Sequence, residues 1–299
     1  MTTVTTRDGT ELYVKDWGTG RPVIMLHGWP LSSDTFDDLA MAVAEAGLRA
    51  IAYDRRGFGR STQPWGGYDY NTLADDLAAV VEATGARDVT LLGFSMGGGE
   101  VARYLSRHGS ARVQQAILVS AVVPFMSKTD DNPDGVDQAV FAAMASELRH
   151  DRAKFWTTFF GDFYGVGYLT QPVTDEVIAW SAVIAMQASL KATLACAAAF
   201  ATTDFRPDLA AFTVPTLLIH GTSDMTVPIA TSARKAAAAI PGSRLIEYDG
   251  APHGLFASDK ARLIGDVVAF VTGEDARVTT PVPITPDVPL LYPIEPMLS

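Results

Sequence analysis

From residue 10 to residue 120, the chain alternates between short apolar runs and amphipathic segments. The apolar runs have no polar face, as in strands covered on both sides, and span residues 22–28, 49–54, 89–94 and 116–120. Between them, apolar residues recur at helical spacing, for example Phe36, Leu39 and Val43 ahead of Gly47. This alternation predicts βαβ units in a parallel sheet. The turn at residues 7–10 joins two earlier runs and predicts an antiparallel hairpin at the start.

The alternation stops after Ala121, and residues 124–205 have a helical pattern rich in Ala, Phe and Met. It then returns, with strands predicted at 216–221 and 244–250 and helices near 229–240 and 257–271. An insertion in a parallel sheet predicts a lid over the carboxyl ends of the strands, where such folds bind ligands.

The pattern therefore divides the chain into a core, a lid and a tail. The core comprises residues 1–123 and 206–272, and the helical lid comprises residues 124–205. The tail, residues 273–299, contains six prolines, which interrupt both helices and sheets. We expect this tail to be disordered.

Composition narrows the class of protein. The 299 residues can form one large domain or two small ones. A formal net charge of −11 argues against a nucleic-acid partner. No apolar run is long enough to cross a bilayer, and the first residues do not resemble a secretory signal. We expect a cytoplasmic protein without a membrane partner, and a buried, unreactive Cys196 as the single cysteine.

Residues 89–97 read VTLLGFSMG, a strand-like run that ends in a Gly-x-Ser-x-Gly pattern. Between a buried strand and a helix, this pattern predicts a tight turn that holds Ser95 in a strained backbone conformation. The turn exposes the hydroxyl at the start of a helix, whose partial positive charge favours a developing oxyanion. Ser95 is therefore the candidate nucleophile.

A nucleophilic serine needs a base and a carboxylate that orients it. His253 follows the last predicted strand in a Gly/Pro-rich loop, and Asp224 follows the strand at 216–221. Both positions lie at the carboxyl edge of the sheet, so Asp224 and His253 are the candidate acid and base. We assign structural roles to the other histidines, which are His27, His108, His150 and His220.

Two backbone N–H groups are candidates for an oxyanion hole, those of Met96 and of Trp29 in the HGWP segment. Pro30 has no N–H to donate, and it restricts the backbone of Trp29 to extended angles. This restriction determines the direction of the Trp29 carbonyl.

Several segments resemble the bacterial cofactor-free haloperoxidases, also called aryl esterases or perhydrolases: HGWPLSSDTF, YDRRGFGRS, GFSMGGGEVARYLSRHG, DFRPDL, IHGTSD and APHGL. The resemblance covers residues 3–272 and implies an α/β-hydrolase fold. That fold has a mostly parallel, eight-stranded sheet with helices on both faces and a helical lid. The resemblance also implies a triad of Ser95, Asp224 and His253, an oxyanion hole at Trp29 and Met96, and neither cofactor nor metal.

The implied chemistry starts from an acyl-enzyme that Ser95 forms with a small ester or carboxylic acid. Water releases the acid, whereas hydrogen peroxide as co-substrate releases a peracid, which oxidises halide in solution. We hypothesise that the Trp29 carbonyl, oriented by Pro30, accepts a hydrogen bond from peroxide and favours this second branch.

Apolar and aromatic residues near these segments are candidates for an acyl pocket, although aromatic side chains in a lid are equally typical of plain packing. The candidates are Trp29, Pro30, Phe94, Phe125, Phe159, Phe163, Val227 and Leu255.

Alternative functions remain open from the sequence. The DDNPDGV segment and the Ser95 turn also resemble relatives that open γ-lactams, so a lactamase or amidase is the second hypothesis. A non-catalytic protein that binds small molecules is the third. The resemblance is compatible with a homo-oligomer.

Overall fold

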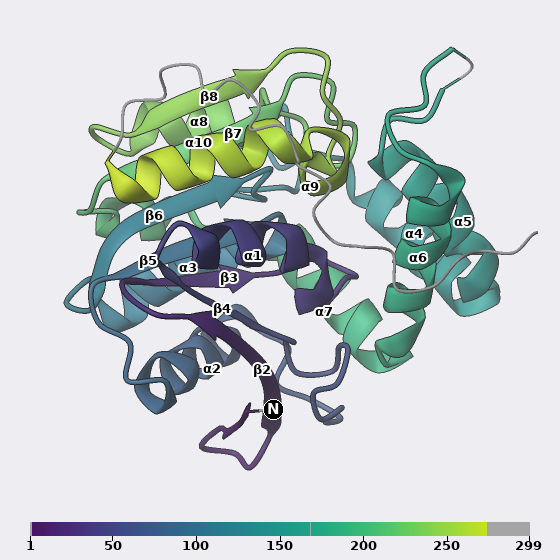
Figure 1. Ribbon diagram of the computed structural model, residues 1–299. Coiled ribbons are helices and arrows are strands. Elements are labelled where there is room, and N and C mark those ends of the chain that lie inside the picture. Colours follow the sequence, from purple (N-terminus) through teal and green to yellow (C-terminus); the bar gives the residue numbers. More distant parts are fainter. Residues whose placement is uncertain (1, 168, 274–299) are drawn as a thin grey trace, which may run out of the picture.

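The computed structural model describes residues 2–167 and 169–273. Within them, eight strands form one sheet in the order β1-β2-β4-β3-β5-β6-β7-β8 (Figure 1). The strands are β1 (Thr2–Thr5), β2 (Glu11–Gly18), β3 (Pro22–Leu26), β4 (Arg49–Tyr53), β5 (Val89–Phe94), β6 (Val113–Val119), β7 (Thr216–Gly221) and β8 (Arg244–Tyr248). β1 and β2 pair antiparallel, and β3 to β8 pair parallel. The predicted hairpin and mostly parallel sheet are confirmed.

Helices cover both faces of this sheet, which explains why every residue of β3, β5 and β7 is buried. α1 (Asp37–Glu45) and α10 (Lys260–Thr272) pack together on one face. α2 (Tyr70–Ala83), α3 (Met96–His108) and α8 (Ala233–Ala239) lie on the other face (Figure 1). The fold is therefore the α/β-hydrolase architecture that the sequence predicts.

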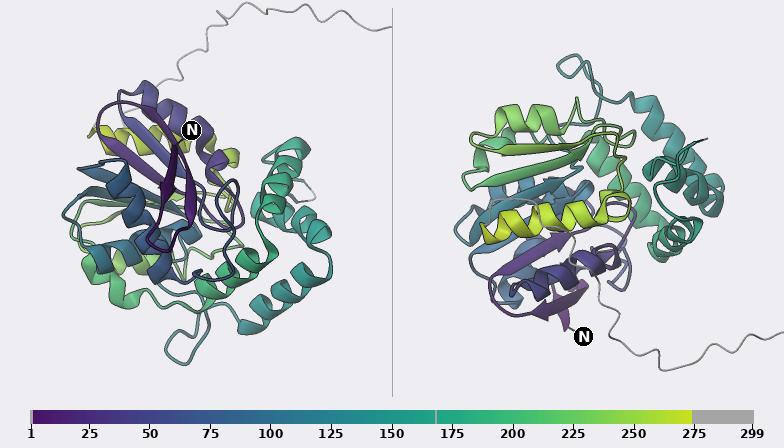
Figure 2. Two further views of the ribbon diagram at one scale, coloured as in Figure 1. Left: turned by 90° about the horizontal axis from the view of Figure 1, so that it is seen from below. Right: turned by 45° about the horizontal axis from the view of Figure 1, so that its top comes forward.

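Helices α4 to α7 lie between β6 and β7 in the chain and beyond the carboxyl ends of the parallel strands (Figures 1 and 2). They are α4 (Gln138–His150), α5 (Arg152–Phe163), α6 (Asp175–Gln187) and α7 (Leu190–Thr202). Side-chain oxygens of Asp137, Asp151 and Ser189 accept backbone N–H groups at the starts of α4, α5 and α7. Among the described residues, no single helix is long and apolar enough to cross a membrane, although α6 and α7 pass that test as a pair bent by 101°.

Some predicted boundaries were wrong. The helix expected near 257–271 is two helices, α9 (Leu255–Ser258) and α10, because the backbone leaves helical geometry at Asp259. The helix expected near 229–240 is limited to α8, since residues 229–232 form turns. The predicted strand at 22–28 ends at Leu26. The predicted Pro-rich tail lies outside the described residues after Gly273.

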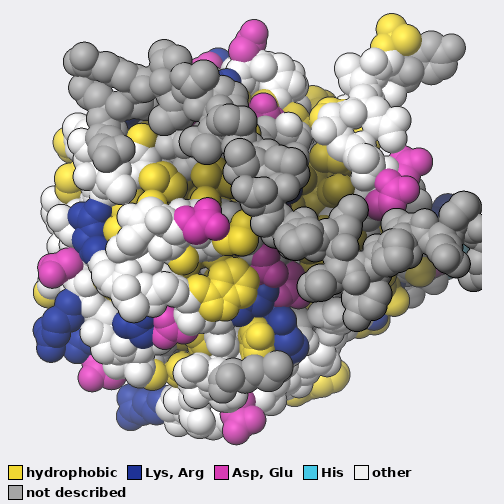
Figure 3. Space-filling model, in the orientation of Figure 1, with side chains coloured by type: hydrophobic (Ala, Val, Ile, Leu, Met, Phe, Trp, Pro, Cys, Tyr) yellow, Lys and Arg dark blue, Asp and Glu magenta, His cyan; other side chains and the backbone are white. Residues whose placement is uncertain are grey.

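On the face shown in Figure 3, basic and acidic side chains are interspersed over the core. An ion pair between Arg49 and Asp16, at 2.6 Å, joins the neighbouring strands β4 and β2. Cys196 is fully buried in α7, as predicted, and burial raises the pKa of its thiol to about 12. A thiol that stays protonated is a poor nucleophile, so Cys196 has a packing role.

Candidate active site

The turn between β5 and α3 places Ser95 at the edge of the sheet. Its backbone has φ of 53° and ψ of −117°, a conformation that L-residues rarely adopt. The flanking glycines allow the close packing that this turn needs. A Cβ atom on Gly93 would lie 2.4 Å from the carbonyl oxygen of Gly97, and one on Gly97 would lie 2.2 Å from that of Leu26. A side chain at either position would force the strand and the helix apart.

His253 reaches Ser95 from the loop after β8. Its Nε2 lies 3.0 Å from Ser95 Oγ, and its Nδ1 lies 2.6 Å from Asp224 Oδ2. The aromatic rings of Phe94 and Phe163 pack on the imidazole, with centroid separations of 5.1 and 4.8 Å. A carboxylate only accepts hydrogen bonds, so Nδ1 carries the proton and Nε2 is free to accept one from Ser95. This tautomer is the one that a general base requires.

Asp224 is held rigidly at the turn after β7. Its Oδ1 accepts the backbone N–H groups of Thr226 and Val227, at 2.9 and 2.7 Å. Burial by itself would raise the pKa of Asp224, but the electrostatic interaction with His253 and hydrogen bonds from His220 and His253 lower that pKa to about 2. The carboxylate is therefore ionised at neutral pH and can stabilise a protonated imidazole.

His220 was assigned a structural role by the sequence, yet it contacts the candidate acid directly. Its Nε2 lies 3.1 Å from Asp224 Oδ2 and 2.8 Å from the carbonyl oxygen of Val227. Both partners are acceptors, so Nε2 carries a proton and is shared between them. The spacing of four residues to Asp224, within one short turn, is the signal that could have revealed this contact.

The remaining histidines have neighbours other than the proposed triad. His27 Nε2 accepts the backbone N–H of Arg55, and its Nδ1 lies 2.9 Å from the carbonyl oxygen of Gly28. Burial, together with the charge of Arg55, lowers the pKa of His27 to about 3, so this ring is neutral. His108 contacts Asp75 at 2.8 Å on α2, and His150 is the last residue of α4.

The two backbone donors predicted for an oxyanion hole belong to Trp29 and Met96. Within residues 2–167 and 169–273, the N–H groups of Trp29 and Met96 donate to no protein acceptor. Met96 is the first residue of α3, and helix starts leave such donors free. The Trp29 side chain anchors its backbone, because its Nε1 donates to the carbonyl oxygen of Thr193 in α7 at 2.9 Å. Its indole also packs edge-on against Trp156, at 5.2 Å between centroids.

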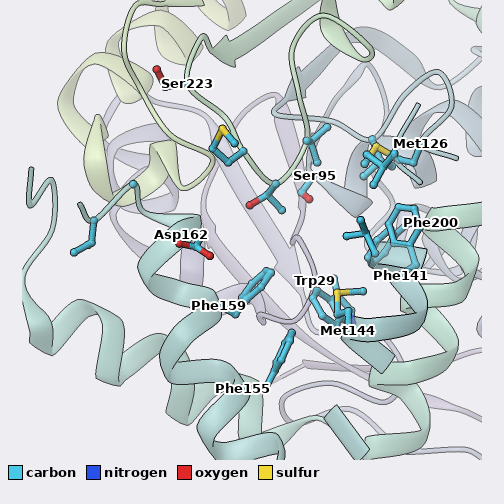
Figure 4. Close-up of a pocket in the computed structure, with 18 of the residues that line it drawn as sticks. Trp29, Ser95, Met126, Phe141, Met144, Phe155, Phe159, Asp162, Phe200 and Ser223 are labelled. Atoms are coloured by element: carbon cyan, nitrogen blue, oxygen red, sulfur yellow. The ribbon is translucent and has the colours of Figure 1, made fainter. Parts of the chain in front are cut away.

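A cavity of about 870 Å³ opens over Ser95 between the sheet edge and helices α4, α5 and α7 (Figure 4). This volume suits a small-molecule ligand. Of the predicted pocket residues, Trp29, Phe159 and Val227 line the cavity. Apolar side chains that the sequence analysis did not propose complete its walls, among them Met126, Phe141, Met144, Phe155, Phe200 and Met225.

The other predicted pocket residues need correction, since they pack behind the cavity wall or beside it. Phe94 and Phe163 are buried against the His253 ring. The Phe125 ring lies 5.1 Å from the guanidinium carbon of Arg206, and Leu255 is fully buried at the start of α9. Pro30 follows Trp29 through a cis peptide bond and is not part of the lining.

Comparison with known proteins identifies relatives over almost the whole chain. The model of the α/β-hydrolase fold family matches residues 21–260. A non-heme chloroperoxidase of Kitasatospora aureofaciens is 44% identical over 275 residues, which is 91% of this chain and 99% of the relative. A bifunctional esterase/perhydrolase of Acinetobacter calcoaceticus is 41% identical over 273 residues, or 90% and 98% of the two chains. The crystal structure of a bromoperoxidase from Bacillus anthracis matches with a TM-score of 0.88 and 42% identity, covering 91% and 99%.

Proposed function

The chain belongs to the α/β-hydrolase fold family, in the branch of the non-heme haloperoxidases and esterase/perhydrolases, and we propose that it is a serine esterase and perhydrolase. One observation carries the proposal. Ser95 Oγ lies 3.0 Å from His253 Nε2, whose opposite nitrogen lies 2.6 Å from the ionised Asp224. This is the arrangement that activates a serine for acyl transfer.

Acylation begins when His253 Nε2 takes the Ser95 hydroxyl proton as Oγ attacks the ester carbonyl carbon. Negative charge then develops on the carbonyl oxygen, and the N–H groups of Trp29 and Met96 are the donors that stabilise it. The protonated His253, held by Asp224, gives its proton to the leaving alcohol or phenol as the C–O bond breaks. Ser95 is left carrying the acyl group.

Deacylation has two outcomes that differ only in the second nucleophile. His253 deprotonates water, which attacks the acyl carbon and releases the carboxylic acid. When it deprotonates hydrogen peroxide instead, attack releases a peracid. The peracid then transfers one oxygen to a halide ion in solution, giving hypohalous acid and the carboxylate. The names of the relatives, which include a chloroperoxidase and an esterase/perhydrolase, support this second branch.

The substrate enters an apolar, aromatic-lined cavity, which favours uncharged esters with apolar groups. A small carboxylic acid can acylate Ser95 when it enters in its neutral form. Apolar walls stabilise the bound ester through its buried surface.

Changing the leaving group of the ester tests whether hydrolysis and perhydrolysis share one acyl-enzyme. Phenyl acetate and p-nitrophenyl acetate should give the same ratio of peracetic to acetic acid at a fixed peroxide concentration. Both esters pass through the same acetyl-Ser95, so the ratio cannot depend on the group already lost. Ratios that differ between the esters would contradict a shared intermediate. A bicyclic γ-lactam in the same panel tests the amidase hypothesis, which would be favoured if the lactam reacted faster than either ester.

A further inference from the structure

Three thioether side chains line the cavity over Ser95. Of the nine methionines in the chain, Met126, Met144 and Met225 line it. Met126 and Met144 lie on the side of the cavity formed by α4 and α7 (Figure 4). Met126 is buried, Met144 is partly buried, and Met225, next to Asp224, is 81% exposed at the opening. The proposed chemistry therefore releases an oxidant beside oxidisable sulfur.

We propose that these methionines, Met144 above all, are modification sites for the peracid that the enzyme itself makes. The inference rests on the proposed perhydrolase function. In the reaction, the thioether sulfur attacks the outer peroxy oxygen of the peracid, and the O–O bond breaks. One oxygen is transferred to sulfur as a sulfoxide, and the peracid leaves as the carboxylic acid with its proton. Sulfur is oxidised by two electrons and the peracid is reduced by two.

The position of these residues favours reaction before the peracid escapes. A peracid formed at Ser95 starts inside the cavity, so its effective concentration at Met126 and Met144 exceeds that in bulk solvent. In the chain's single cysteine, by contrast, the thiol is fully buried in α7 and does not line the cavity. The thioethers are therefore the sulfur atoms that meet the product first.

Oxidation would alter the site that caused it. A sulfoxide is polar, whereas the surrounding wall is formed by side chains such as Phe141 and Phe200. A polar group in that wall weakens the binding of apolar esters, so KM rises as turnover with peroxide proceeds. Esterase activity therefore declines during turnover with hydrogen peroxide. Methionine sulfoxide reductases can reverse the oxidation.

Peptide mapping by mass spectrometry after turnover with phenyl acetate and hydrogen peroxide tests this inference. An excess of free methionine in the solution scavenges peracid that has left the enzyme. Met41 and Met186, 54% and 42% exposed and outside the cavity lining, are the matched control sites. We expect sulfoxide at Met144 to exceed that at Met41 by at least about fivefold, because the scavenger cannot intercept peracid inside the cavity.

Two comparisons make the outcome decisive. The same protein treated with added peracetic acid should oxidise by exposure, with Met41 ahead of Met144. During turnover, Met144→Leu should retain activity at least about twice as long as the parent enzyme, whereas Met41→Leu should match it. Equal protection of Met144 and Met41 by the scavenger, with peracid still being released, would overturn this inference alone. Absence of any peracid release would overturn both it and the proposed perhydrolase function.

Discussion

The sheet edge and the cavity above it are held together by different forces. At the edge, Asp224 is fixed by two backbone N–H groups and two imidazoles, and Ser95 by a strained turn between glycines. In the cavity wall, side chains such as Phe159 and Met144 are held by packing alone. Hydrogen bonds fix atoms within tenths of an ångström, whereas packed apolar groups tolerate replacement. We therefore expect the edge to determine the reaction, and the wall to determine which molecules undergo it.

The largest effect should come from Ser95→Ala, with Ser120→Ala as its matched control. Both serines directly follow neighbouring parallel strands and have positive φ, 53° and 46°, but Ser120 Oγ donates to the backbone carbonyl oxygen of His253, at 3.3 Å. We expect kcat for p-nitrophenyl acetate to fall by about 10⁶-fold in Ser95→Ala, as in other serine hydrolases. In Ser120→Ala it should fall by less than about tenfold, since one weak hydrogen bond is lost. Similar losses in both variants would contradict a unique role for Ser95.

A second test concerns His220, whose imidazole also contacts Asp224, the proposed acid. His220→Ala removes the Nε2–H group beside Asp224 Oδ2, and we expect kcat to fall by about 10- to 100-fold with KM little changed. His220→Gln keeps a side-chain N–H donor and should recover part of this loss. Urea unfolding of both variants measures their stability. A loss of kcat without a loss of stability indicates a misplaced Asp224 and not a misfolded protein. Equal kcat in the two variants at equal stability would argue that His220 merely fills space.

The wall is tested by Phe159→Ala, which enlarges the cavity beside Trp29 without touching the triad. We expect KM for aryl esters to rise by about tenfold with kcat nearly unchanged, because lost apolar contact weakens ground state and transition state alike. Met186→Ala, on the exposed side of α6, is the control and should leave both constants unchanged. A fall in kcat larger than the rise in KM would show that the wall also takes part in the reaction.

The buried, neutral His27 predicts a pH dependence of stability. The pKa of His27 is lowered from 6.5 to about 3, so between these values the unfolded chain binds a proton that the folded chain does not. The free energy of unfolding should therefore fall as pH decreases from 6.5 toward 3. Between pH 7 and pH 5, we expect the parent protein to lose about 1–2 kcal/mol more than His27→Gln, measured by urea titration. Asp224, whose pKa is lowered from 3.8 to about 2, contributes stability that is lost only below about pH 5, outside the measured interval from pH 7 to pH 5.

The smallest effect is expected at Pro30, which restricts the backbone of Trp29 and so the direction of its carbonyl. Pro30→Leu should lower the ratio of peracid to acid by about two- to threefold, equivalent to less than 1 kcal/mol. Total turnover of phenyl acetate serves as the internal control. An unchanged ratio would remove the hypothesis that this carbonyl binds peroxide.

Much of the sheet edge could be predicted from sequence, because its signals are local. Continuous apolar runs mark buried parallel strands, and the residue after each run lies at the carboxyl edge. Ser95, Asp224 and His253 were proposed on this ground, and the structure brings them within hydrogen-bonding distance. The comparisons confirm the family resemblance. The contact of His220 with Asp224 was missed: their spacing of four residues places the two side chains near each other, but it does not fix the direction in which the imidazole ring points.

The wall could not be predicted, because aromatic residues occur all around the lid helices. In α5, Phe155 and Phe159 line the cavity, whereas Phe160 and Phe163 are fully buried and do not. Phe163 even packs on Phe159, one turn earlier, so neither residue type nor helical spacing separates the lining positions from the buried ones. The sequence therefore identified the proposed triad more readily than the wall of the proposed substrate cavity.

The account depends most on a covalent bond between the substrate's acyl group and Ser95. Rapid acid quenching after mixing with p-nitrophenyl acetate, followed by peptide mass spectrometry, measures that bond directly. We predict one acetyl group on the peptide containing Ser95, formed in a burst together with p-nitrophenol and lost faster as hydrogen peroxide is added. Steady turnover with the acetyl group on another residue, or with the peroxide having no influence on its loss, would contradict the account.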